Sequence, residues 1–460
     1  MTAPDERYAG FDLPGEAAYD EARQVFNLHA PVSPAATVTA RTADEVRAAV
    51  RLAGERGLAV RVQSTGHGSA TARPMDGALL IRTRIREPVA VDVRRRVARV
   101  SAGTLWGAVV EAAAPHGLAA AHGSSPTVGV VGYLLRGGLS FYGRAAGLAV
   151  NTVRAVELVT ADGELRRADP ESDPDLFWAL RGGGGGFGVV TAVEFALFPV
   201  AKVVTGAAFW PVAEAPRLLE RWRRWTEDAP REATTAMRVM NLPKLPELPS
   251  VLTQGPVLCL DGVVTAETAG DLARAERQAA ELLGPLRAAA APLLDDWRVA
   301  DVSDVPATHL DPPDPVPVHG DHLLLGELGA EGVAAFLRAV DRPGTALVVG
   351  ELRQLGGALA EPDPAGGALS ALEARYAYSG SGVPIGETTE KAIDEHTAQV
   401  RAALAPWDTG RTAPTFVATT GQPQCHLDAN AVRAVDAVRL RVDPRGMFRG
   451  DIDRGASALA

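Results

Sequence analysis

Cysteine, positive charge and long apolar runs are all scarce in this chain. Only two of its 460 residues are cysteine, Cys259 and Cys425, so a disulfide framework is excluded. Cysteine and histidine show no spacing typical of a zinc site, and we expect no metal. The formal net charge of −10 disfavours nucleic acids and anionic membranes as partners, because both require a basic surface.

The sequence also lacks any uninterrupted apolar stretch long enough to span a bilayer. Its first residues carry several acidic side chains and no apolar core segment, which is unlike a secretory signal. We therefore expect a cytoplasmic protein. Apolar residues make up 47% of the chain and charged residues 22%, as in ordinary globular proteins.

The length fits two or three domains. Up to residue 202, short strand and helix patterns alternate. Thr42 and Glu45 form a capping box that predicts a helix and then a strand leading into the His67 loop, and residues 89–101 predict a hairpin. From residue 203 to about 407, strand-like runs are separated by long amphipathic helices, which predicts an antiparallel sheet covered by helices. Residues 408–460 form a tail with one further helix. The predicted class is α+β, with division at these boundaries.

Three loops of small residues stand out in the first part. They cover residues 64–71 around His67, residues 123–138, and the glycine run at 182–188. Glycine lets backbone N–H groups approach a pyrophosphate closely, although glycine runs also serve simply as turns. A helix pattern precedes the third loop and a strand pattern follows it, which is the reverse of the order in a Rossmann dinucleotide site.

The motifs themselves are more specific. RVQSTGHGSA, GSSPTVGVVGYLLRGG and DPDLFWALRGGGGGFGVVTAVEF follow one another in this order. Together they resemble the FAD domain of the vanillyl-alcohol oxidase / p-cresol methylhydroxylase superfamily, most nearly the berberine bridge enzyme-like oxidases. The resemblance covers residues 18–200 and resumes weakly in the tail. It implies an FAD-binding domain from residues 1–202 and 408–460, and a substrate domain, residues 203–407, whose sheet covers the isoalloxazine ring.

The resemblance implies that His67 carries FAD through an 8α-histidyl link, which requires an unprotonated imidazole. The alternative is that His67 is only a packing residue of the loop. Ser125 stands where many relatives have a second, cysteinyl link, so we expect a single link. Val128 lies near a position that admits oxygen in relatives. The full set of implied cofactor residues is His67, Ser64, Thr65, Gly66, Gly68, Ser69, Gly123, Ser124, Ser125, Thr127, Val128, Gly129, Gly132, Gly137, Gly138, Gly188, Val189 and Val190.

The substrate side is less marked in the sequence. Tyr376 and Tyr378 are two residues apart on a predicted strand, so their phenols share a face. If that face looks onto the flavin, one phenol could accept a substrate proton, with Arg353 as the cation that lowers its pKa. The alternatives are that both tyrosines only pack and that Arg353 pairs with Glu351.

Four other residues have predicted roles, two near the flavin ring and two in the structure of the tail. His122 and Tyr142 are further candidates near the ring, and we expect His426 and Asp428 to be structural.

These observations predict an FAD-dependent oxidase that takes hydride from a small alcohol, sugar or secondary metabolite and is reoxidised by oxygen, which gives hydrogen peroxide. The alternatives left open are a dehydrogenase with another acceptor, a redox-inactive flavin-binding protein, and a two-domain binding protein without flavin. The substrate and the oligomeric state are not predicted.

Overall fold

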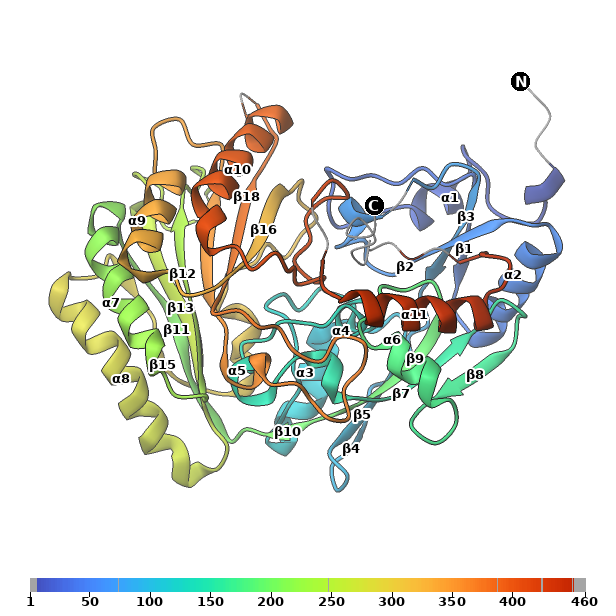
Figure 1. Ribbon diagram of the computed structural model, residues 1–460, viewed down its shortest axis with the longest axis horizontal. Coiled ribbons are helices and arrows are strands. Elements are labelled where there is room, and N and C mark those ends of the chain that lie inside the picture. Colours follow the sequence, from blue (N-terminus) through green and yellow to red (C-terminus); the bar gives the residue numbers. More distant parts are fainter. Residues whose placement is uncertain are drawn as a thin grey trace.

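The chain folds around three main sheets, two in one lobe and one in the other (Figure 1). The computed structural model describes residues 6–450 except residues 73, 247, 387, 423, 424 and 449. The first sheet is parallel, in the order β1-β3-β2, with β1 at Ala36–Ala40, β2 at Ala59–Gln63 and β3 at Ala78–Thr83. Helix α1, Ala17–Ala22, lies beside β1.

Helix α2, Ala43–Glu55, connects β1 to β2 and begins where the capping pattern predicts. The Thr42 hydroxyl accepts a hydrogen bond from the Glu45 N–H at 3.1 Å, which satisfies one of the free amides of the first turn. Gly57 follows the helix with a φ of +65°, a conformation that glycine adopts without strain. The predicted helix-then-strand unit that leads into the His67 loop is thus confirmed.

The second sheet is antiparallel, in the order β4-β5-β9-β7-β8. The predicted hairpin at 89–101 is confirmed by β4 and β5, and the helix before the glycine run by α6. The strands are β4 (Ala90–Asp92), β5 (Val97–Ser101), β7 (Val153–Val159), β8 (Leu165–Ala168) and β9 (Val189–Ala196). The helices are α3 (Trp106–Ala113), α4 (Val130–Leu135), α5 (Gly143–Ala146) and α6 (Pro174–Leu180), and β6 (Leu118–Ala119) pairs with β10 (Phe198–Pro199).

The third sheet makes up the second lobe and is antiparallel throughout, in the order β14-β11-β13-β12-β17-β18-β16, with β15 also on β11. Its strands are β11 (Lys202–Pro211), β12 (Ala233–Met240), β13 (Val257–Ala266), β14 (Leu294–Asp295), β15 (Arg298–Ala300), β16 (His319–Leu325), β17 (Val349–Gln354) and β18 (Tyr376–Gly382). Strands β12 and β16 were not predicted. Polar and apolar residues alternate irregularly in both strands, so the regular alternation that predicts a strand is missing.

Four helices cover one face of this sheet, side by side in the order α8, α7, α9, α10 (Figure 1). They are α7 (Ala215–Glu227), α8 (Leu272–Ala289), α9 (Gly329–Val340) and α10 (Glu390–Leu404). Their apolar sides and one face of the strands form a continuous buried core. The predicted α+β class, with an antiparallel sheet covered by helices, is confirmed.

Two segments join the lobes. Residues 355–374 leave the third sheet, and Leu359, Leu369 and Leu372 pack into the core around the second sheet. In the tail, α11 (Ala429–Val442) packs on α6 (Figure 1), and the Met447 carbonyl accepts a hydrogen bond from the Val60 N–H at 2.8 Å. The first lobe is therefore completed by residues from the end of the chain.

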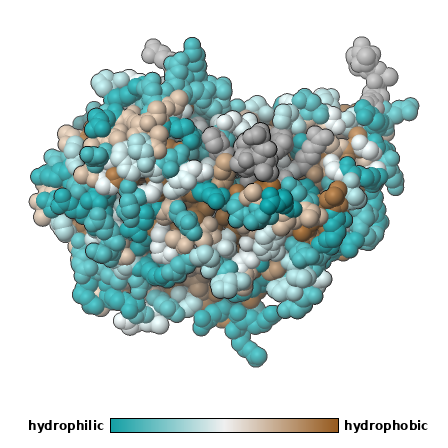
Figure 2. Space-filling view, in the orientation of Figure 1, coloured by the Kyte–Doolittle hydropathy of each residue, from teal (hydrophilic) through white to brown (hydrophobic). Residues whose placement is uncertain are grey.

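Hydrophilic residues cover most of the face shown in Figure 2, and hydrophobic residues appear on it in smaller patches. Among the residues that the structure describes, no helix has the length and apolarity needed to cross a membrane.

Candidate functional site

His67 lies in the loop directly after β2, between the two sheets of the first lobe. Its Nδ1 is 2.9 Å from the Thr65 hydroxyl and its Nε2 is 3.2 Å from the Thr127 hydroxyl. Its ring stacks on Phe26, with the centroids 3.8 Å apart and the planes 12° from parallel. Burial lowers the pKa of His67 to about 4, although Asp311 acts in the opposite direction. The imidazole is therefore neutral at physiological pH.

A cavity of about 180 Å³ opens beside His67. Three arginines, Arg82, Arg84 and Arg86, bring positive charge to its wall. Gly103 and Leu105, which precede helix α3, also line it, but the N–H groups of Trp106 and Gly107 at the start of that helix donate to the carbonyls of Val128 and Pro126. The lining residues are Phe26, Ser64, Thr65, His67, Arg82, Thr83, Arg84, Arg86, Gly103, Leu105 and Thr127.

The second predicted loop is built around the Tyr133 ring. A Cβ on Gly123 would lie 3.0 Å from that ring and a Cβ on Gly138 would lie 2.5 Å from it, so larger residues would push the ring away. The Tyr133 hydroxyl and the Ser69 hydroxyl are both buried, and neither has a hydrogen-bond partner among the residues described. Buried hydroxyls are normally satisfied, so these two fit polar atoms of a bound molecule.

The other predicted residues of this loop are placed as follows. Ser125 lies 2.9 Å from the Thr127 hydroxyl, and the Ser124 hydroxyl donates to Asp311 at 2.5 Å. Val128 is half-buried against the core of this lobe. A Cβ on Gly129 would lie 3.5 Å from the Ser64 hydroxyl, which is ordinary contact. Gly132 is exposed and has open space at its Cβ position. Gly137 has a φ of +97°.

In the first loop, a Cβ on Gly66 would meet Val25 at 2.7 Å and one on Gly68 would meet Arg136 at 2.6 Å. Glycine is therefore required at Gly66, which also has a φ of +75°, whereas at Gly68 the flexible end of the Arg136 side chain can move aside. Of the predicted cofactor residues, four line the cavity, which are Ser64, Thr65, His67 and Thr127.

The third loop lies against the tail. The Arg439 guanidinium donates to the carbonyl of Gly183 at 3.2 Å and to that of Gly185 at 2.6 Å. Gly188 sits against the Val159 carbonyl, and the side chains of Val189 and Val190 are buried in the cores. None of these residues lines the cavity beside His67. A cofactor role for Gly188, Val189 and Val190 stays a prediction. Only their backbone atoms could contact a cofactor, because the two valine side chains are buried in the cores.

Comparison with known proteins adds to this geometry. Residues 34–169 match the model of the FAD binding domain. The chain is 33% identical over 198 residues to the (R)-6-hydroxynicotine oxidase of Paenarthrobacter nicotinovorans, which covers 43% of each chain. It is 32% identical over 198 residues to the carbohydrate oxidase of Microdochium nivale, covering 42% of this chain and 40% of the relative. These alignments span less than half of each relative's length.

The fold extends the likeness over both lobes. The solved BBE-like 1 protein of Physcomitrella patens superposes with a TM-score of 0.80 at 20% identity, covering 96% of this chain and 95% of that one. The chain contains an FAD-binding domain and has the berberine bridge enzyme-like fold. The resemblance seen in the sequence motifs is thus confirmed.

The residues present fit FAD. The cavity wall combines a neutral imidazole, hydroxyls and three arginines, which suits a flavin with a pyrophosphate. The buried hydroxyls of Ser69 and Tyr133 offer two further hydrogen bonds.

Tyr376 and Tyr378 do share a face of β18, but it is the face that the helices cover. The Tyr376 hydroxyl bonds to Thr226 of α7 at 2.5 Å, and Tyr378 packs against Phe336 of α9. Burial raises the pKa of both phenols. The condition for a catalytic role, that this face looks onto the flavin, is not met, and the alternative holds: both tyrosines pack in the core between sheet and helices.

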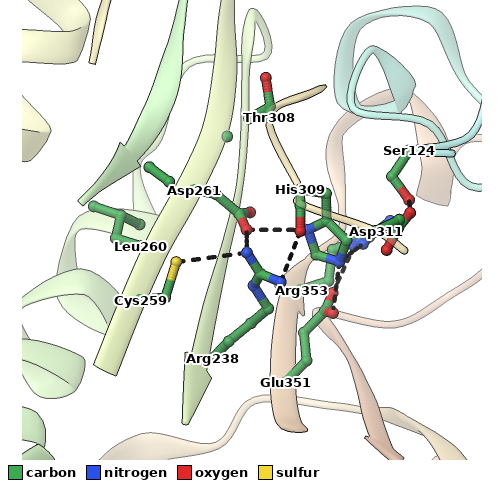
Figure 3. Close-up of polar contacts among 12 residues, drawn as sticks. Ser124, Arg238, Cys259, Leu260, Asp261, Thr308, His309, Asp311, Glu351 and Arg353 are labelled. Carbon is green, nitrogen blue, oxygen red and sulfur yellow. Dashed lines mark hydrogen bonds and ion pairs between the residues drawn. The ribbon is translucent and has the colours of Figure 1, made fainter. Parts of the chain in front are cut away.

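The opposite face of the sheet turns toward the first lobe and carries a buried cluster of charges (Figure 3). Arg238 of β12 pairs with Asp261 of β13. His309 lies 3.0 Å from Asp261 through Nδ1 and 3.2 Å from Glu351 through Nε2. Arg353 donates through Nε to Glu351 at 2.7 Å. The predicted alternative that Arg353 pairs with Glu351 is confirmed.

The two arginines of the cluster are matched by Asp261 and Glu351, and the charge of a protonated His309 is matched by the nearby Asp311, which also acts on both arginines. Burial is the largest influence and acts to lower the pKa of His309, as does Arg238, but Asp261 and Glu351 raise it to about 9. Burial acts to raise the pKa of Glu351, but Arg353 and His309 hold it well below its ordinary value. The raised pKa favours the protonated form of His309, and Glu351 is an anion at neutral pH. Arg353 Nη2, also a donor, lies 3.1 Å from the same His309 Nε2.

Contacts with the first lobe place this charged cluster near the flavin loops. The Arg353 guanidinium lies over the rings of Phe141 and Phe416, 4.9 and 5.2 Å from their centroids. Asp311, two residues after His309, accepts the hydrogen bond from Ser124. The cluster therefore stands between the sheet and the loop that carries Ser124 (Figure 3).

Several of these residues were not predicted. The alternation RTRIR at residues 82–86 could have indicated the arginines, because every second residue of a strand end points the same way. No local signal marks Arg238, Asp261 or His309.

The remaining candidates are structural. His122 is buried beside Tyr142, with Nδ1 2.6 Å from the Gly123 carbonyl, and burial lowers its pKa to about 4. Asp428 caps α11 by accepting from the N–H groups of Asn430 and Ala431, and His426 lies 3.0 Å from the Gly182 carbonyl. The predicted structural role of Asp428 and His426 is confirmed.

Proposed function

We propose that the protein is an FAD-dependent oxidase whose FAD is attached covalently through His67 alone. The observation that carries the proposal is the neutral imidazole of His67 on the cavity wall, held by Thr65, Thr127 and the Phe26 ring. Only an unprotonated imidazole has the lone pair that an 8α-histidyl link requires. Ser125 supplies no thiolate, so a second link is not expected.

When bound, FAD supplies the chemistry of the reaction by accepting a hydride from the substrate and passing electrons to oxygen, which yields hydrogen peroxide. The charged cluster of the third sheet supplies the polar groups on the substrate side. The carboxylate of Glu351 bonds to Arg353 and His309 and keeps further acceptor capacity, so it can accept a hydrogen bond from a substrate O–H or N–H group and orient it. Its strongly lowered pKa makes it a weak base, so this role is one of positioning.

The cations around Glu351 have a second effect. Arg353 and the protonated His309 hold the carboxylate ionised, so it is available as an acceptor across the neutral range. Two relatives are named as oxidases, one of a hydroxynicotine and one of carbohydrate. Both names support a substrate with an amine or alcohol carbon, and the half-buried Val128 supports access by oxygen.

The test is a screen of the purified protein with sugars, secondary alcohols and cyclic amines under air, with peroxide and oxygen both measured. We expect peroxide to form in step with oxygen consumption for at least one class. Glu351→Gln should lower kcat/KM on that substrate while the flavin stays bound. Reduction of a dye without peroxide would indicate a dehydrogenase, and a flavin that no substrate reduces would contradict the proposal.

A further inference from the structure

We propose that His29, His319, Glu390 and Asp394 form a binding site for one divalent transition-metal ion, best suited to Zn²⁺, at the seam between the two lobes. His29 comes from the N-terminal segment and His319 begins β16. Glu390 and Asp394 lie four residues apart on α10, which places both carboxylates on one side of that helix. The site is separate from the flavin cavity and does not rest on the proposed function.

Three of the four donor residues already converge, and Asp394 contacts one of them. One atom each from His29, His319 and Glu390 lie within 4.8 Å of one another. His319 Nε2 is 2.6 Å from Asp394 Oδ1, and His29 Nε2 is 3.7 Å from Glu390 Oε2. The two imidazole rings are 4.8 Å apart and tilted by 59°. Donors of a tetrahedral zinc site are about 3.3 Å apart, given Zn–N bonds of about 2.0 Å.

The burial of the four residues suits a site that can close around an ion. His319 is buried and the His29 side chain is 20% exposed, so both imidazoles are held by their surroundings. The carboxylates of Glu390 and Asp394 are exposed, so they have room to rotate by the small distance required. Two imidazoles with two carboxylates form a donor set that zinc accepts, whereas Mg²⁺ prefers oxygen donors and retains its water.

The position of the site gives the ion a structural role. The Asn27 side chain donates to the Val318 carbonyl at 2.9 Å and accepts from the Val318 N–H at 3.0 Å. His29 and His319 lie directly beyond this pair along the same two segments. An ion between them would attach the segment that carries Phe26 to the second lobe. Phe26 is the residue whose ring stacks on His67.

The experiment uses untagged, full-length protein that has been dialysed against a chelator. Titration with ZnCl₂ by calorimetry should show one ion per chain, and zinc at a hundred times its dissociation constant should raise the melting temperature by about 3 °C. His29→Ala and Glu390→Gln should each weaken binding at least tenfold. The matched control is Glu395→Gln, an exposed carboxylate on the same helix that pairs with Lys391.

Glu390 is exposed and His29 is only partly buried, so their variants should fold even if His319→Ala does not. MgCl₂ should give neither heat of binding nor a shift in melting temperature. The proposal is overturned if zinc shows no saturable binding of one ion per chain, or if it binds equally well to His29→Ala and Glu390→Gln.

Discussion

Phe26 and His67 lie ring on ring, with their centroids 3.8 Å apart and their planes 12° from parallel. The backbone holds the pair together, because the Phe26 N–H donates to the Thr65 carbonyl at 3.1 Å. The phenyl ring covers one side of the imidazole, and burial is the main reason that the pKa of His67 falls to about 4. A residue before the first sheet thus contributes to the burial that keeps the proposed flavin anchor neutral.

Phe26→Leu should expose the imidazole and raise the pKa of His67 toward its ordinary value. We expect the fraction of covalently bound flavin to fall at least threefold when the protein is reconstituted at pH 6, and to change less at pH 8, where the imidazole is neutral in either case. Phe11→Leu is the matched control, because Phe11 packs against the N-terminal core. Equal losses at both pH values would contradict the role of Phe26.

Tyr378→Phe should leave activity unchanged and alter the free energy of unfolding by less than about 1 kcal/mol, because the buried Tyr378 hydroxyl has no hydrogen-bond partner among the residues described. Tyr376→Phe loses the hydrogen bond to Thr226 and should cost about 1 kcal/mol, also without loss of activity. Steady-state kinetics and urea denaturation check both. A hundredfold loss of kcat in either variant would restore the catalytic interpretation of the tyrosines.

Arg238→Met should destabilise the protein by about 3–5 kcal/mol, because it leaves Asp261 buried with His309 as its remaining charged neighbour. The double variant Arg238→Met/Asp261→Asn removes both charges and should recover part of that loss. Chemical denaturation of the two single variants and the double variant gives the coupling. Simple additivity of the two single effects would show that the pair does not interact.

The pH dependence of stability should have a maximum near pH 6.5. Burial lowers the pKa of His67, His122 and His322 to about 4, so the unfolded chain binds protons first and stability falls as the pH drops from about 6.5 to 4. His309, with its pKa raised to about 9, binds its proton more tightly when folded. Its contribution is complete below about pH 6.5 and is lost as the pH rises to about 9.

Each of these histidines can change the free energy of unfolding by up to about 3 kcal/mol across its range. His322 is the best histidine for testing the acid decline in stability. Its Nδ1 bonds to the Tyr378 carbonyl and its Nε2 accepts a hydrogen bond from the Ala413 N–H, and these two bonds hold the imidazole neutral. Urea denaturation of His322→Gln at pH 4.5, 5.5 and 6.5 should show a shallower acid decline than the parent protein. An unchanged decline would contradict the assignment.

Much of the first lobe is predictable from the sequence because its signals are local. The Thr42 cap, the hairpin and the helix before the five glycines each depend on neighbouring residues, and the structure has all three. His67 was marked by its motif, and its loop lies at a strand end as expected.

The substrate side could not be predicted in the same way. Alternation along a strand shows that Tyr376 and Tyr378 share a face, but the packing of α7 and α9 decides which face that is. The charged cluster is assembled from β12, β13, β17 and the loop with His309, which are far apart in the chain. The candidate metal site joins the N-terminal segment to β16 and α10, so no spacing in the sequence indicates it.

The covalent anchor is the central claim, and acid precipitation of the purified protein tests it most directly. We predict that the yellow colour stays with the pellet, is absent from the pellet of His67→Ala, and is kept in that of Ser125→Ala. Colour that moves entirely to the supernatant in the parent protein would contradict the covalent link, and a pellet that stays yellow in His67→Ala would show that another residue carries the flavin.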